Sequence, residues 1–80
     1  MDEVDRKFED RGRRWAERML DRLQTHWLEV PLVWPGTREQ AATIVHALSD
    51  DSLSAIERER LVEIVQNGAR HAWRDMVGNA

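Results

Sequence analysis

Apolar residues in the first third of the chain recur with the 3.6-residue period of an α-helix. Acidic residues fill the first turn of this segment, where the positive end of the helix dipole favours them. Pro31 disfavours helical geometry at Val30, which marks the end. The pattern therefore predicts a long helix over residues 2–29 with one core-facing side. That side comprises Val4, Phe8, Trp15, Ala16, Met19, Leu20, Leu23, His26 and Trp27.

Two more helical segments are predicted in the rest of the chain. Thr37 and Gln40 have the spacing of a capping box, which predicts a helix over residues 38–49. The apolar face of that helix holds Ala41, Ile44, Val45 and Leu48. After a polar break, S-D-D-S at residues 49–52, a third helix starts near residue 53, with Ser54 and Glu57 forming a second box. Its apolar positions are Leu53, Ile56, Leu61, Ile64, Val65, Ala69, Ala72, Trp73 and Met76.

Both long helical segments contain a glycine on the apolar side. Asn67-Gly68 is a common helix stop, which would leave residues 69–77 as a short fourth helix. The apolar register nevertheless runs across Gly68 without a phase shift, and this favours one continuous helix. Gly12 and Gly68 would each permit a neighbouring helix to approach closely, at a cost of about 1 kcal/mol in helix propensity.

The sequence shows no β pattern and no internal repeat, so it predicts an all-α fold. We expect a single helical domain over residues 1–80: a small three-helix bundle with two long helices and one short, or four helices if the chain breaks at Gly68. A chain of 80 residues buries only roughly 60–65% of its unfolded surface, so the core is thin. Without cysteine there are no disulfides, which leaves oligomerisation, such as a homodimer, or tight helix packing to supply stability.

The distribution of apolar and charged residues also bears on location. No charge-free apolar run approaches the ~20 residues that a membrane span needs. The first residues, M-D-E-V-D, are acidic, the opposite of a secretory signal. We therefore expect a cytoplasmic protein with no membrane contact.

The segment V-P-L-V-W-P-G at residues 30–36 is unlike the rest of the chain, because it is apolar throughout. In one interpretation Leu32, Val33 and Trp34 fold under and close one end of the bundle. In the other, Leu32 and Trp34 are exposed to bind a partner, since prolines reduce the entropy lost on ordering such a segment. The first is favoured, with Trp34 as the side chain shared with a partner. Trp27 fits either a core or a surface position.

A stripe of basic residues is the sharpest feature of the first helix. Its members are Lys7, Arg11, Arg14, Arg18 and Arg22, spaced to lie on one face beside the apolar side. Arginine suits phosphate or carboxylate binding, and a basic stripe is typical of nucleic-acid binding. Acids on neighbouring rows repel phosphates, so direct nucleic-acid binding ranks last. A solvated face, or one paired within the chain as Asp10 with Arg14, ranks first, and an acidic protein surface second.

No motif in the sequence indicates catalysis or a cofactor. The histidines, His26, His46 and His71, lack the spacing of metal ligands to carboxylates. No nucleophile elbow, phosphate loop or pair of buried carboxylates is evident. We therefore expect neither an enzyme nor a metal or cofactor site.

These patterns predict a small acidic interaction protein, a regulator or inhibitor that binds and occludes a larger protein. An acidic chain could cover the basic groove of a nucleic-acid-handling complex, as small phage-encoded inhibitors of bacterial defence do; the analogy is one of size and charge only. The alternative is a nucleic-acid accessory protein that uses the basic stripe. The expected partner-binding residues are Leu32, Trp34, Trp27, Arg11, Arg14, Arg18 and Arg22.

Overall fold

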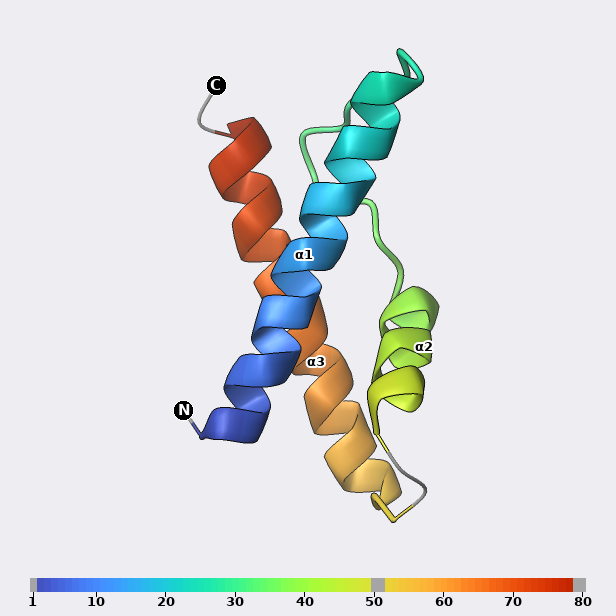
Figure 1. Ribbon diagram of the computed structural model, residues 1–80, viewed down its shortest axis with the longest axis vertical. Coiled ribbons are helices and arrows are strands. Elements are labelled where there is room, and N and C mark those ends of the chain that lie inside the picture. Colours follow the sequence, from blue (N-terminus) through green and yellow to red (C-terminus); the bar gives the residue numbers. More distant parts are fainter. Residues whose placement is uncertain (1, 50–51, 79–80) are drawn as a thin grey trace.

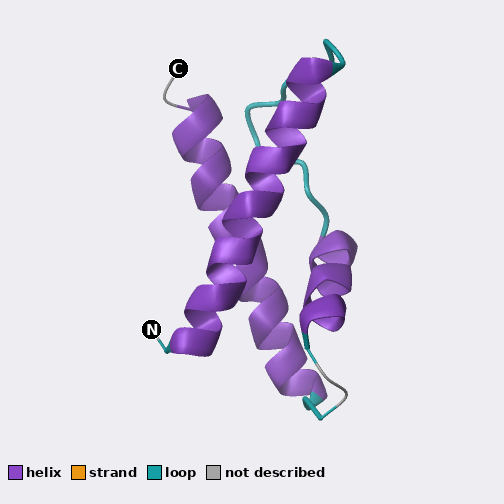
Figure 2. Cartoon of the chain, in the orientation of Figure 1, coloured by secondary structure: helices purple, strands orange, loops and turns teal. Residues whose placement is uncertain are grey.

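A computed structural model describes residues 2–49 and 52–78. It contains α1 (Glu3–Thr25), α2 (Arg38–Leu48) and α3 (Ala55–Trp73), and α3 continues into a π-helical turn, η1 (Arg74–Gly78). No strand occurs in these two ranges (Figure 2). The predicted all-α fold, with two long helices and one short, is confirmed. The third helix runs through Gly68 without a break, as the apolar register indicated.

The two long helices cross like the strokes of an X and run in the same general direction (Figure 1). The short α2 runs the opposite way beside the N-terminal half of α3, and a linker over residues 26–37 joins it to α1 (Figure 1). The whole body measures 41 × 23 × 15 Å.

Glycine lies at the crossing point on both helices. Gly12 of α1 and Gly68 of α3 are both buried. A Cβ on Gly12 would overlap the carbonyl oxygen of Val65, and a Cβ on Gly68 would overlap that of Glu9. The backbones of α1 and α3 therefore touch at this point, which confirms the close approach predicted from the two glycines.

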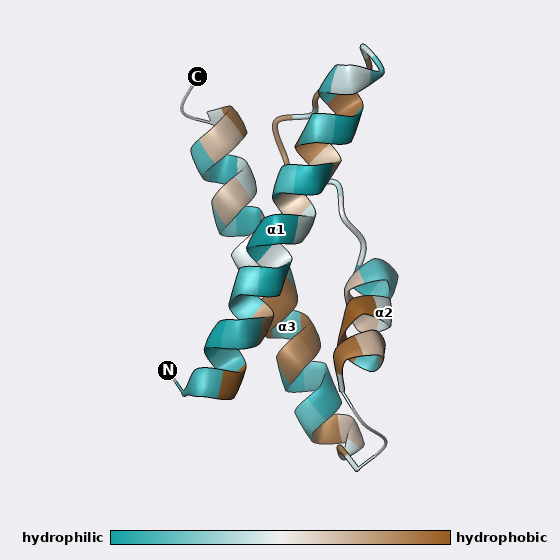
Figure 3. Ribbon diagram, in the orientation of Figure 1, coloured by the Kyte–Doolittle hydropathy of each residue, from teal (hydrophilic) through white to brown (hydrophobic). Residues whose placement is uncertain are grey.

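The crossing divides the core into two clusters, one on each side of it. The first is roofed by α2 and consists of Phe8, Ala41, Val45, Leu61, Val62 and Val65. The second, towards the C-terminal ends of the long helices, consists of Ala16, Ala69, Ala72 and Trp73, with Trp34 of the linker packed against it. Figure 3 shows the hydrophobic positions of α2 on its side towards α3. Thus α2 covers the first cluster and the linker covers the second.

Helix capping follows the sequence closely. Thr37 and Gln40 form the reciprocal capping box that was predicted, and Ser54 accepts a hydrogen bond from the backbone of Glu57. The third helix begins at Ala55, after this cap, and α2 ends at Leu48. Residues 50 and 51 of the predicted polar break lie outside the described residues.

The end of the first helix was predicted wrongly. It ends at Thr25, well before Pro31, through two hydrogen bonds that reverse the chain. The amide of Trp27 donates to the carbonyl of Gln24 (3.2 Å) and that of Leu28 to the carbonyl of Leu23 (2.8 Å). This is the Schellman pattern, and it places Trp27 in the left-handed region with φ 57°.

Four positions predicted to face the core are exposed instead: Val4, His26, Trp27 and Ile56. All four lie near the ends of the long helices, where the crossing carries α1 and α3 apart and leaves the ends without a neighbour (Figure 1). Conversely, Val62 and Gln66 are buried although the predicted stripe left them out. Because α3 packs against both α1 and α2, it buries a wider arc than one stripe.

Replacing Gly12 with alanine is expected to lower the free energy of unfolding by about 1–3 kcal/mol, because the new methyl group must displace the α3 backbone. The same change in an exposed helix would raise it by about 1 kcal/mol. Urea denaturation followed by circular dichroism measures the difference. Gly78→Ala is the matched control, since the nearest atom to its added Cβ lies at 3.5 Å. A Gly12→Ala variant as stable as the wild type would contradict the backbone contact.

Candidate functional site

The linker is fastened to the long helices by tryptophan side chains. The ring of Trp34 meets that of Trp15 edge to face, with centroids 4.7 Å apart, and that of Trp73 at 5.3 Å. Its indole Nε1–H donates to Oε1 of Gln66 (2.8 Å), and Nε2 of Gln66 donates to the carbonyl of Gly36 (3.4 Å). The indole of Trp73 donates to the carbonyl of Pro31 (3.0 Å). Both ends of the 30–36 segment are therefore held to α3.

The two interpretations of this segment each describe part of it. Trp34 folds under, as the closing interpretation predicted, and is half-buried. Leu32 and Val33 do not; each is 79% exposed. The expectation that all three side chains close the bundle is therefore wrong for Leu32 and Val33, and the alternative that exposed Trp34 is wrong as well. Trp34 is turned inward because it finds a hydrogen-bond partner in Gln66 and packs against the rings of Trp15 and Trp73.

Four large apolar side chains remain exposed on the linker. These apolar linker residues are Trp27, Leu28, Leu32 and Val33. Trp27 is 94% exposed, yet its backbone takes the left-handed conformation that glycine usually supplies at this place in a helix end. A bulky residue there is a marked outlier. The backbone geometry at the end of the helix favours glycine and does not explain a tryptophan at this position.

A second feature is a groove between α1 and α2. Both helices pack on α3 and hardly touch each other. Two hollows of about 360 and 430 Å³ lie between them and share Arg11 and Arg14, so they form one continuous depression, the α1–α2 groove. The part next to the N-terminal half of α2 is lined by Arg11, Arg14, Trp15, Arg18, Met19, Arg22, Gln40, Thr43 and Ile44.

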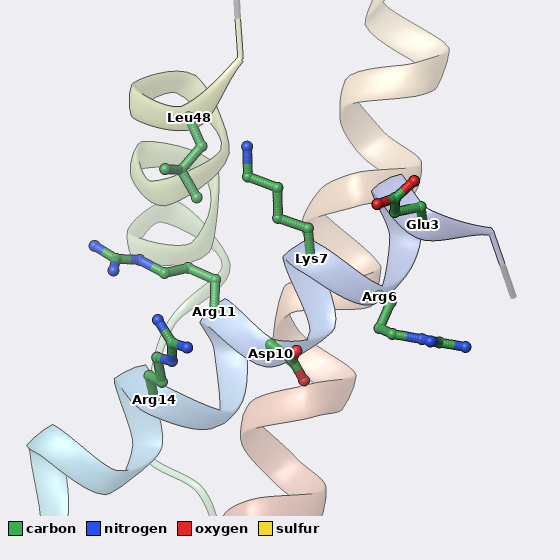
Figure 4. A pocket seen from close by; sticks show the side chains of 7 residues that line it. All are labelled: Glu3, Arg6, Lys7, Asp10, Arg11, Arg14 and Leu48. Atoms are coloured by element: carbon green, nitrogen blue, oxygen red, sulfur yellow. The ribbon is translucent and has the colours of Figure 1, made fainter.

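The predicted basic stripe follows this groove. The stretch near the end of α2 is lined by Glu3, Arg6, Lys7, Asp10, Arg11, Arg14 and Leu48. Figure 4 shows Arg11 and Arg14 extending towards α2, whereas Arg6 points away from it. The fold thus brings together the four arginines proposed for partner binding and places them opposite α2. Sequence periodicity could not predict that α2 would face them.

The basic stripe lacks acidic partners within the described part of the chain. Over residues 2–49 and 52–78, no carboxylate lies within ion-pair distance of Lys7, Arg11, Arg14, Arg18 or Arg22. The first-ranked expectation therefore holds in part. Lys7, Arg14, Arg18 and Arg22 are exposed, as a solvated face requires, but the expected pairing within the chain, including that of Asp10 with Arg14, is wrong. Only the neighbouring pair of Glu9 with Arg13 forms, at 3.8 Å. Arg14 is turned towards α2 and Asp10 away from it (Figure 4).

Two arginines elsewhere are paired between helices. Arg38 of α2 reaches Glu59 and Glu63 of α3, and Arg60 of α3 reaches Asp5 of α1 at 2.6 Å. The hydrogen bond and charge of Glu59 raise the pKa of Arg38 above its ordinary value, and Asp5 raises the pKa of Arg60 in the same way. Exposed pairs of this kind add little stability. The residues of the basic stripe differ from Arg38 and Arg60, because no carboxylate of the described residues lies within ion-pair distance of them.

The described residues offer no sign of other site types. Within them, no group of three or more His, Asp or Glu side chains could hold a metal ion. Nor is any helix in those ranges both long enough and apolar enough to cross a membrane. No protein-family model, curated protein or solved structure matches the chain. The function must therefore be argued from the apolar linker residues and the α1–α2 groove.

Replacing Trp34 with phenylalanine is expected to lower the free energy of unfolding by about 1–3 kcal/mol, because Oε1 of buried Gln66 loses its donor. Adding Gln66→Leu should recover part of the loss, since it removes the buried acceptor left without a donor and gives up only the longer, 3.4 Å bond to the Gly36 carbonyl. Thermal and urea unfolding measure both effects. Trp27→Phe, at an exposed position, is the control and should not change stability. A double variant less stable than the sum of the two single changes would contradict this role of the hydrogen bond.

Proposed function

We propose that this protein is a non-catalytic regulator or inhibitor that acts by binding a larger protein. The observation that carries the proposal is Trp27, almost fully exposed in a backbone conformation that disfavours it. Tryptophan is enriched among the residues that dominate binding energy at interfaces. An exposed tryptophan, held at a strained position, is accounted for if its side chain is used by a partner.

The fastening of the linker supports this proposal. Trp34 is bound to Gln66, and Trp73 to Pro31, so Leu32 and Val33 are presented from a segment that is already ordered. A preordered segment loses less entropy on binding than a mobile one. In this proposal Leu32 and Trp27 make the partner contacts, and Trp34 positions the linker rather than serving as the main contact.

The charge arrangement supports a partner with an acidic surface. The arginines of the α1–α2 groove have no counter-charge among the described residues, so an approaching carboxylate would not have to displace an existing ion pair. Charge complementarity of this kind increases association rate and specificity more than raw affinity.

The second candidate function is nucleic-acid binding, and the same free arginines favour it. Binding to duplex DNA through five basic residues should weaken with salt at a log–log slope of about −4 to −5.

Capture of partners from the native host should depend on the apolar linker residues. Wild-type protein and the variants Trp27→Ala and Leu32→Ser would be used as baits, with quantitative mass spectrometry of what each retains. A specific partner should be depleted about tenfold or more by either change, as for residues central to an interface. Ile56→Ser is the matched control, because Ile56 is 83% exposed at the opposite end of the molecule.

If both linker variants retain the same proteins as the wild type, the linker is not the binding surface. Light scattering over a dilution series provides a second reading. A wild-type homodimer that Leu32→Ser converts to monomer would show that the apolar linker residues serve self-association instead.

Replacing Trp27 with glycine should separate stability from function. Glycine relieves the left-handed backbone, so the free energy of unfolding is expected to rise by about 1 kcal/mol, while partner binding falls. Trp27→Ala is the matched control, since alanine loses the side chain but keeps the backbone cost. Chemical denaturation and the capture assay measure the two effects. A glycine variant less stable than the wild type would show that the Trp27 side chain stabilises the fold, and would contradict the proposal.

A further inference from the structure

The α1–α2 groove combines a basic rim with an apolar floor. We propose that it binds an acidic amphipathic helix, which the larger protein supplies; this inference rests on the proposed function and names the chemistry of its partner. Such helices insert their apolar face into a groove and leave their polar edges at the rim. Four properties of the groove support this occupant: its length, its floor, its charge and its place in the fold.

The length of the groove suits a short helix. Its arginine rim extends from Arg11 to Arg22 along α1. At the rise of an α-helix this is about 16 Å, or three turns. The opposite wall is α2, whose Gln40, Thr43 and Ile44 face the same hollow. A three-turn helix would therefore lie against α1 over its whole length and against α2 over about one turn.

The floor of the groove is apolar and partly open. Trp15, Met19 and Ile44 line it, and each is half-buried rather than fully covered. Since α1 and α2 both pack on α3 and hardly touch, a helix between them would rest on side chains from each. It would complete a fourth position in a bundle that now has three. Leucine-sized side chains at helical spacing are the groups that fill such a floor.

Charge decides between acidic protein and nucleic acid as the occupant. The hollow that holds Arg14, Arg18 and Arg22 has no acidic residue in its lining. Acids nevertheless lie close by: Glu17 and Asp21 are exposed on the neighbouring row of α1. A continuous phosphate backbone would meet both, whereas the carboxylates of a helix occur at separate positions and can face the arginines alone. The aliphatic part of the floor also suits leucine better than a base, and the ring of Trp15 is already engaged by Trp34.

The charge of the groove also differs between its two ends. Glu3 and Asp10 line only the stretch beside Leu48, at the end of α2. The rest of the rim is basic. The stretch beside Leu48 also holds Arg6 and Lys7, so its charges partly cancel, and an acidic helix should place its most acidic part against Arg14–Arg22. This asymmetry would fix the direction in which the helix lies.

The experiment is a fluorescence-anisotropy titration of the intact protein with labelled synthetic probes. The main probe is a designed peptide of three to four turns, with leucine on one helical face and glutamate on the others. A peptide of the same composition with leucine and glutamate shuffled tests whether amphipathic pattern matters. A version with lysine in place of glutamate tests charge, and an oligothymidylate tests nucleic acid. Only the patterned acidic peptide should bind, and moderately more weakly as salt rises.

Two variants place the binding in the groove. Arg14→Gln with Arg18→Gln should weaken binding of the patterned peptide by about tenfold or more. The matched control is Arg58→Gln with Arg74→Gln, two exposed arginines that line neither hollow of the groove, and it should bind as the wild type does. Thr43→Glu adds a negative charge to the opposite wall and should also weaken binding. Thr43 is exposed and glutamate favours helix, so this variant keeps its fold, as circular dichroism would verify.

Several results would overturn the inference. Equal binding of the patterned and shuffled peptides would mean attraction by charge alone. Binding of oligothymidylate but not peptide would assign the groove to nucleic acid, and no binding of any probe would remove it as a site. None of these results depends on the linker. Loss of captured partner in Trp27→Ala, with a groove that binds no peptide, would leave the proposed function standing and reject only this partner chemistry.

Discussion

The contact between the backbones of α1 and α3 at Gly12 and Gly68 is the constraint on which the remaining architecture depends. Two helices that meet without side chains between them cross at a point and diverge on both sides of it. The spaces on either side of the crossing must then be filled by other parts of the chain, which has few apolar residues. One is filled by α2 and the other by a single tryptophan on the linker, Trp34. The two clusters of the core are the direct result.

The same crossing accounts for what is left on the surface. Because α2 packs on α3 and not on α1, a groove remains beside α1, and the basic stripe of that helix forms its rim. Because the helix ends diverge, Trp27 at the end of α1 has no helix to pack against and stands in solvent. Both candidate binding features therefore follow from two helices, α1 and α3, that touch at their centres and diverge towards their ends.

The two features differ in how they could serve a partner. The apolar linker residues offer burial, the main source of binding energy, and they come from a segment that tryptophan hydrogen bonds already hold in place. The groove offers unpaired positive charge over an apolar floor, which provides direction and specificity. In a protein with a net charge of −3, this local basic surface is set apart from the prevailing charge. In the proposed function, the first feature would supply affinity and the second would select the partner.

Local interactions in the sequence determined the helices themselves. The caps at Thr37 and Ser54 and the continuity through Gly68 follow from neighbours a few residues apart, and each could be predicted. The glycines on the two apolar sides also indicated a close approach, although tertiary packing decides which backbone atoms meet there. The tertiary structure alone decided which side chains meet across the chain. It turned Trp34 inward and Leu32 outward, and set the arginines of α1 opposite α2. The physical reason is that periodicity defines the apolar side of a helix but not the angle at which two helices cross. That angle determines which parts of each apolar side are covered and which polar rows come to border a groove.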